Sequence, residues 1–219
     1  MKIIQSSISE NGTTKGNAGD QTGKELNIKE WYNRPWDAVI RYKDSEISSK
    51  AVKIAKTLTE SNLVGYSQAD RNSLYNVLKK YNFDITRYIA SGVKTNCDCS
   101  SFVYACFACV LPRLRNDNNA PTTHTFIDFF DNYEFSVFTN ENYTRSSKNL
   151  LNGDILLSIG KHTAIVYDDS TTTTHYSDSV ENALAVIASE VLKGTFGNGE
   201  KRKENIYKAV QQKVNKLLS

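Results

Sequence analysis

An uninterrupted apolar run, FVYACFACVL at residues 102–111, most constrains what this chain can fold into. A membrane-spanning helix needs about 20 apolar residues, so a run of this length predicts a buried core element instead. The polar sequence Asp98-Cys99-Ser100-Ser101 comes directly before it and supplies residues typical of a helix start. Together they predict a helix over 100–111 that is apolar nearly all round and lies at the centre of the fold.

The cysteines all lie close to this predicted helix, at Cys97, Cys99, Cys106 and Cys109. A disulfide framework in a secreted protein would scatter cysteines to join distant loops, so this clustering argues against one. Cys106 and Cys109 fall inside the apolar run and are expected to be small buried hydrophobes. Cys97 has no assigned role; it modulates redox sensitivity or merely packs.

Cys99 stands where the predicted helix begins. Unpaired backbone N–H groups and the positive end of the helix dipole favour a thiolate there. The same N–H groups can hold the oxyanion that develops when a carbonyl carbon is attacked. Cys99 is therefore the candidate nucleophile.

Two histidines follow on predicted strands. His162 begins a strand after a tight turn, and a strand packed on the central helix can bring its imidazole to the sulfur of Cys99. His175 lies on the next predicted strand, and a hairpin turning at 168–170 would place it beside His162. His175 could then orient His162, as the third member of a triad does, with Asp168 or Asp169 as substitutes.

A zinc site built from Cys97, Cys99 and two histidines is the main alternative. The C-x-C spacing is not the two-to-four spacing usual for zinc, so no metal or cofactor is expected. His124, in the sequence PTTHTF, has no partner in the sequence and is expected to be a surface or loop histidine.

The periodicity of the chain changes along its length and predicts an α+β fold. Residues 1–22 read as loop-like, and residues 25–41 as two extended pieces broken at Arg34-Pro35, which can add strands to a sheet. Amphipathic helices are expected at 50–60 and at 67–81, the second with Ser67 as its N-cap. An antiparallel meander is expected to follow, with strands at 134–138, 154–159, 162–167 and 171–176.

From residue 179 onward the pattern turns helical again. Helices are expected at 180–193 and 200–218 on either side of the glycine-rich sequence GTFGNG, forming a compact module. The chain therefore divides into a domain at 1–177 and a small helical domain at 178–219.

The charge balance limits the partners. The chain carries 27 Lys and Arg against 24 Asp and Glu, a net charge of +3. That excess is too weak to predict nucleic-acid binding, although it suits an anionic polymer such as a bacterial wall. The first residues, MKIIQSSISENGTT, do not resemble a secretory signal, so the chain is expected to be made in a cytoplasm and to leave by another route.

The motifs resemble a known family. DCSSF at 98–102, GDILL at 153–157 and HTAIV at 162–166, followed by His175, resemble the NlpC-type cysteine peptidases, and more narrowly the cysteine peptidoglycan hydrolases of phages and prophages of Gram-positive bacteria. GDQTGKE at 19–25 and WYNRPW at 31–36 are similar to segments that precede the catalytic cysteine in those enzymes. The resemblance implies a papain-like fold, with the nucleophile helix packed on an antiparallel sheet. It also implies that Cys99 is the nucleophile, His162 the base and His175 the residue that orients the base. Substrate contacts are implied for Asp98, Ser100 and Gln21.

The tail carries a second resemblance. Residues 187–203 and 209–218 are similar to a three-helix wall-binding repeat found in phage lysozymes and other lytic enzymes. The resemblance implies a small helical bundle that binds peptidoglycan through a set of polar, aromatic and glycine residues: Glu190, Phe196, Gly197, Asn198, Gly199 and Arg202. Because one copy is present where several are common, a homo-oligomer would strengthen binding.

Taken together, these resemblances imply an endolysin. It would cut an amide of Gram-positive peptidoglycan, as an N-acetylmuramoyl-L-alanine amidase or as a stem-peptide endopeptidase. It would accumulate in the host cytoplasm and reach the wall at lysis. The alternatives are a thiol acyltransferase or toxin effector on the same fold, and a wall-binding protein with a spent catalytic domain.

Overall fold

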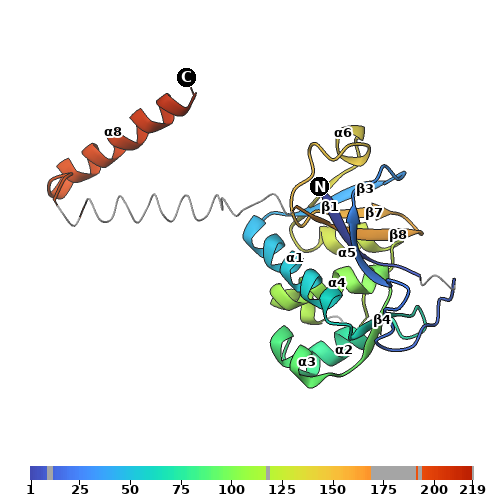
Figure 1. Ribbon diagram of the computed structural model, residues 1–219. Coiled ribbons are helices and arrows are strands. Elements are labelled where there is room, and N and C mark those ends of the chain that lie inside the picture. Colours follow the sequence, from blue (N-terminus) through green and yellow to red (C-terminus); the bar gives the residue numbers. More distant parts are fainter. Residues whose placement is uncertain (9–11, 117–118, 169–190, 192–193, 219) are drawn as a thin grey trace. The chain divides into compact units, whose positions relative to one another are not determined.

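The computed structural model describes residues 1–8, 12–116, 119–168, 191 and 194–218 (Figure 1). The chain separates into two units, Met1–Thr171 and Thr172–Ser219. His175, Asp169 and Glu190 lie outside the described residues, as does the predicted strand at 171–176. The predicted domain boundary between residues 177 and 178 stays a prediction.

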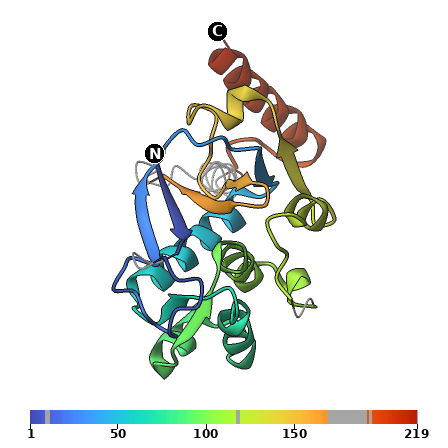
Figure 2. The same cartoon turned by 90° about the vertical axis from the view of Figure 1, so that its right-hand side faces the viewer.

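The first unit is built on a six-stranded sheet with the strand order β2-β1-β8-β7-β3-β6 (Figure 2). Every neighbouring pair in this sheet is antiparallel. The strands are β1 (Lys2–Ser6), β2 (Leu26–Glu30), β3 (Ala38–Tyr42), β6 (Phe135–Phe138), β7 (Ile155–Ser158) and β8 (His162–Tyr167). The first strand of the chain therefore pairs with β8, so the two ends of this unit meet inside one sheet.

The sheet confirms some strand predictions and corrects others. The predicted strands in 25–41 are present as β2 and β3, and the β7–β8 hairpin is confirmed. The loop-like prediction for 1–22 is wrong over β1, where consecutive residues Ile3 and Ile4 are both fully buried. Because opposite faces of β1 are both covered, the sequence there lacks the polar alternation that marks a half-buried strand. The simple meander is also wrong, since β3 lies between β7 and β6.

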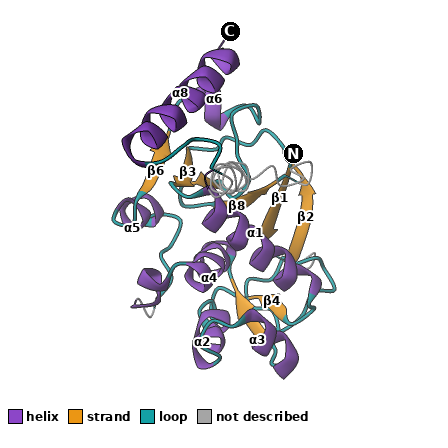
Figure 3. Ribbon diagram, turned by 90° about the vertical axis from the view of Figure 1, so that its left-hand side faces the viewer, coloured by secondary structure: helices purple, strands orange, loops and turns teal. Residues whose placement is uncertain are grey.

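The central helix is α4 (Cys99–Val110), which is buried along nearly its whole length, as predicted (Figure 3). The long helix α1 (Ser45–Glu60) packs beside it, capped by the Asp44 carboxylate, which accepts hydrogen bonds from the backbone N–H groups of Glu46 and Ile47. Helix α2 (Ser73–Lys80) begins later than predicted, so Ser67 is not its N-cap. The smaller elements are β4 (Val64–Tyr66), α3 (Ile85–Ser91), β5 (Thr95–Cys97), the 3-10 helix η1 (Pro112–Asn116), α5 (Phe126–Asp131) and α6 (Glu141–Thr144).

Two apolar clusters cover the two faces of the sheet. On the face toward α4 and α1, the sheet contributes Ile4, Ile40, Ile155, Leu157 and Ile165. On the other face it contributes Ile3, Val39, Leu156, Ala164 and Val166, which pack with Trp36 and Leu150. Full burial of a large aliphatic side chain stabilises the fold by about 1.5–3 kcal/mol. Alternate residues of β1 and β8 thus anchor the sheet to both layers, which fixes where the first residue of β8 points.

The second unit is described over residues 191 and 194–218. Helix α8 (Gly199–Leu218) confirms the predicted helix at 200–218. The predicted helix at 180–193 lies almost wholly outside the described residues, so the helical bundle stays a prediction. None of the described helices in either unit is both long enough and apolar enough to cross a membrane.

Candidate active site

The start of α4 is fixed by a reciprocal cap. The backbone N–H of Ser101 donates to Asp98 Oδ1 at 2.7 Å, and the backbone N–H of Asp98 donates to Ser101 Oγ at 2.8 Å. This capping box satisfies two helix-terminal donors at once. It sets Cys99 as the first residue of the helix, where the sequence predicted the nucleophile.

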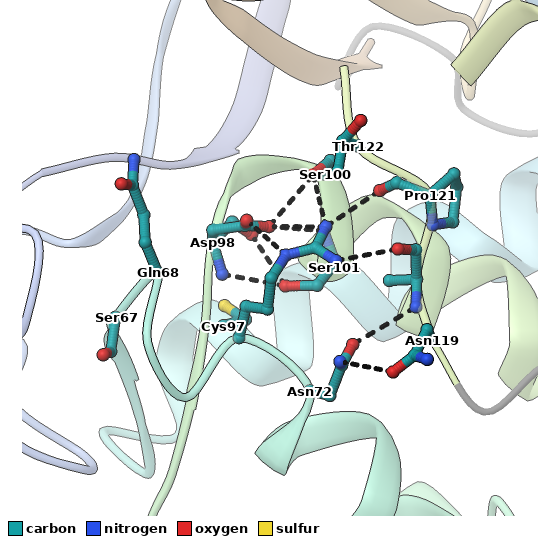
Figure 4. Close-up of polar contacts among 12 residues, drawn as sticks. Ser67, Gln68, Asn72, Cys97, Asp98, Ser100, Ser101, Asn119, Pro121 and Thr122 are labelled. Carbon is teal, nitrogen blue, oxygen red and sulfur yellow. Dashed lines mark hydrogen bonds and ion pairs between the residues drawn. The ribbon is translucent and has the colours of Figure 1, made fainter. Parts of the chain in front are cut away.

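Arg71 holds this cap from the segment before α2. Figure 4 labels its partners Asp98, Ser100 and Pro121. Its Nε donates to Asp98 Oδ2 at 2.6 Å, and its Nη2 donates to Ser100 Oγ at 2.8 Å. Nη1 and Nη2 also donate to the backbone oxygens of Ala120 and Pro121, at 2.7 and 2.8 Å. One planar guanidinium therefore joins the start of the nucleophile helix to the loop that precedes α5.

The thiol of Cys99 is protonated in this environment. Burial, followed by the charge of Asp98, raises the pKa of Cys99 to about 11, although Arg71 and the N–H groups of Thr163 and Ser100 lower it. Burial therefore opposes the thiolate that the helix start is expected to favour. The side chain is 8% exposed, and loss of hydration of the thiolate outweighs the N–H groups and the Arg71 charge that lower the pKa.

The start of β8 lies beside the start of α4. Helix α4 and strand β8 are in contact, and the backbone N–H of Thr163, the residue after His162, lowers the pKa of the Cys99 thiol. The structure therefore brings together the two segments that carry the predicted nucleophile and base. The catalytic roles of Cys99 and His162 stay predictions.

His162 is buried and contacts two neutral side chains, Gln5 and Trp36. Its Nε2 lies 2.9 Å from Gln5 Oε1 on β1, and its ring stacks on Trp36 with 6.4 Å between ring centroids. Burial, then the charges of Arg34 and Lys29, lowers the pKa of His162 to about 4. The imidazole is therefore neutral near pH 7 and can accept a proton.

Sequence reasoning missed several residues of this site. Gln5 gave no signal because its strand was not predicted. Trp36 lies in a segment that the family resemblance noted, but nothing in the sequence placed it against His162. Tyr66 on β4 is close enough for the charges of Cys99 and Asp98 to act on it, and burial is the main reason that its pKa rises to about 12.

The predicted substrate-binding residues are engaged within the protein. Asp98 and Ser100 belong to the Arg71 network, and Gln21 Nε2 donates to the backbone oxygen of Val64 at 2.8 Å. Substrate contact by these side chains stays a prediction.

The other predicted residues fall in different places. His124 is exposed in a loop, as predicted, and its ring lies against the β7–β8 turn, where a Cβ on Gly160 would be 2.6 Å from its Cε1. Asp168 donates its backbone N–H to Asn152 Oδ1 at 3.1 Å.

The remaining cysteines are core residues. Cys97 is fully buried and donates to Ser6 Oγ at 3.4 Å, and burial raises its pKa. Cys106 and Cys109 are buried, which confirms the prediction for them. In the part of the chain that the structure describes, no group of three or more His, Cys, Asp or Glu side chains gathers to hold a metal ion.

The predicted wall-binding residues that the structure describes, all but Glu190, lie in or next to the turn that begins α8. Arg202 donates from Nε to the Gly197 oxygen at 2.9 Å and from Nη2 to Asn198 Oδ1 at 2.8 Å. The Phe196 oxygen accepts from Asn205 Nδ2 at 3.2 Å, and Gly199 has a positive φ of 61°. Arg202 therefore braces this turn. Wall contact by these residues stays a prediction.

Comparison with known families matches both units. The model of the endolysin-like domain family matches residues 3–173, and that of the CW_7 repeat family matches residues 186–218. Neither the curated proteins nor the solved structures contain a match to this chain.

Proposed function

Because this chain belongs to the endolysin-like domain family, we propose that it cuts an amide bond of Gram-positive peptidoglycan with Cys99 as the nucleophile. The chain is a peptidoglycan-targeting endolysin that carries a cell-wall repeat. The observation that supports the proposal is the contact between α4 and β8, the elements that begin with Cys99 and His162.

The proposed reaction moves one proton between two neutral groups. His162 removes the proton from Cys99 as the sulfur attacks the amide carbon, and the oxyanion faces the N–H groups at the start of α4. His162 then protonates the leaving amine, and the C–N bond breaks to leave a thioester. Water attacks the thioester with His162 as base, which releases the acid and restores the thiol.

The pKa values of the pair indicate when the proton moves. Cys99 has a pKa of about 11 and His162 has a pKa of about 4, so both are neutral near pH 7. Proton transfer therefore accompanies the attack rather than preceding it as a stable thiolate–imidazolium pair. The sequence predicts an orienting third group at His175, Asp168 or Asp169, and that role stays a prediction.

Two classes of bond fit this chemistry. One joins muramic acid to L-alanine and defines an amidase; the others lie within the stem peptide and define an endopeptidase. We propose that the cell-wall repeat holds the enzyme on its substrate, and that the protein stays in the host cytoplasm until lysis. A homo-oligomer would add further copies of the repeat.

Paired cysteine variants test this proposal. On purified Gram-positive walls, Cys99→Ala should abolish lysis, because the attacking atom is removed. Cys97→Ala is the matched control, since Cys97 is also buried and lies two residues away; it should keep lytic activity. Alkylation of the wild-type thiol should stop lysis, and chelators should not. Full lysis by Cys99→Ala contradicts the proposal, and inhibition by chelators that zinc reverses favours a metal mechanism.

A further inference from the structure

The proposed function, on which this inference rests, needs a side chain that holds the His162 ring in place. We propose that Gln5, on the first strand of the chain, positions His162 for proton transfer. The site would then be assembled from both ends of the first unit, with the order Gln5, Cys99, His162 along the sequence.

Strand register places Gln5 within reach of His162. In the β1–β8 pair, Ile3 lies opposite Val166 and Ile4 lies opposite Ile165. The same register, continued by one residue, sets Gln5 opposite Ala164, two residues from His162. Such diagonal neighbours lie roughly 7–8 Å apart, a gap that a glutamine side chain spans.

The alternation of side chains along β1 separates Gln5 from its neighbour. Ile3, two residues before Gln5, packs in the cluster that contains Trp36 and Ala164. Ser6 points the other way and accepts a hydrogen bond from Cys97. Gln5 therefore shares the sheet face of Trp36, whose ring stacks on His162.

Burial makes the contact specific. Gln5 is 4% exposed and His162 is 8% exposed, and the gap between Gln5 Oε1 and His162 Nε2 is 2.9 Å. A buried amide oxygen needs a donor, and Nε2–H supplies one. With the proton on Nε2, the lone pair of Nδ1 is free to accept the proton of a thiol.

A neutral partner also suits the charge of the site. Lys29 on β2 and Arg34 act on His162 as cations. The other titratable groups near the start of β8 include Cys99, Lys161, the exposed His124 against Gly160, and Asp37, whose carboxylate accepts the N–H of Ile159. In the described ranges, no carboxylate forms an ion pair with His162, so an amide orients the ring without raising its pKa.

Kinetics of matched variants test the role of Gln5. Gln5→Ala should lower kcat/KM on soluble wall fragments by about 10- to 100-fold, because a ring free to rotate is seldom aligned. Gln5→Glu should keep more activity but shift the acid limb of the pH profile to higher pH, since a carboxylate favours the imidazolium. Ser6→Ala is the control for damage to β1 and should match the wild type. The inference is overturned if Gln5→Ala keeps the wild-type kcat/KM. It is also overturned if His175→Ala lowers kcat/KM and Gln5→Ala does not.

Nuclear magnetic resonance of the His162 ring tests the contact without any substrate. The wild type should show the Nε2–H tautomer near pH 7, and Gln5→Ala should show a mixture of tautomers. If Gln5→Ala changes the tautomers but the wild type does not lyse walls, the proposed function is refuted and the Gln5 contact is supported. The same tautomer in both proteins overturns the inference, even when the wild type lyses walls.

Discussion

Acid should destabilise the first unit through His162, whose side chain is largely buried. Burial and the charges of Arg34 and Lys29 lower its pKa from 6.5 to about 4, so the unfolded chain takes up a proton that the folded protein resists. The contribution of neutral His162 to the free energy of unfolding is fully present above pH 6.5 and is lost as the pH falls toward 4. At about 1.4 kcal/mol per pH unit, this window of roughly 2.5 units amounts to about 3 kcal/mol of unfolding free energy.

Urea unfolding of the full chain between pH 7 and pH 4 measures this loss. The protein has two tryptophans, Trp31 and Trp36, and both lie in the first unit, so tryptophan fluorescence reports that unit alone. The matched variant is His162→Gln, which removes the titrating ring and keeps an amide able to bond Gln5. The wild type should lose about 3 kcal/mol more than the variant over this range. Parallel losses in the two proteins would refute the reasoning.

Three further predictions concern other side chains. Arg71→Met leaves the Asp98 carboxylate buried without its cation and should cost about 3 kcal/mol in urea unfolding, whereas Arg87→Met, which breaks an exposed pair, should cost under about 1 kcal/mol; equal costs would contradict this. Alkylation of Cys99 should keep accelerating with pH beyond pH 9, and a plateau below pH 8 would show that the thiol is not masked by burial. Arg202→Ala, made in the inactive Cys99→Ala chain, should weaken sedimentation with purified walls because the turn loses its brace; unchanged binding would exclude this turn from wall recognition.

Local signals in the sequence predicted the centre of the fold. The apolar run at 102–111 and the Asp98–Ser101 cap lie within one stretch of chain, and α4 forms there as expected. The β7–β8 hairpin was likewise predictable, because a short turn joins two runs of strand-forming residues. Helix α2 starts late because residues before it are used elsewhere: Arg71 turns toward Asp98 instead of entering the helix.

The chemistry around the site depends on contacts between distant residues. Gln5 and His162 are 157 positions apart in the sequence, and no periodicity connects them. The pKa of Cys99 also depends on distant residues. The helix start is a local feature, but the burial that raises this pKa comes from the packing of the whole unit. Pattern reasoning therefore identified the candidate catalytic residues, while their partners and charge states required the structure.

Mass spectrometry of the fragments that the protein releases from purified Gram-positive walls tests the central claim most directly. The account predicts soluble fragments with new amino termini from the wild type and none from Cys99→Ala. New L-alanine amino termini identify an amidase, and other new termini identify an endopeptidase. Walls left intact by the wild type, or the same fragments released by Cys99→Ala, would contradict the account.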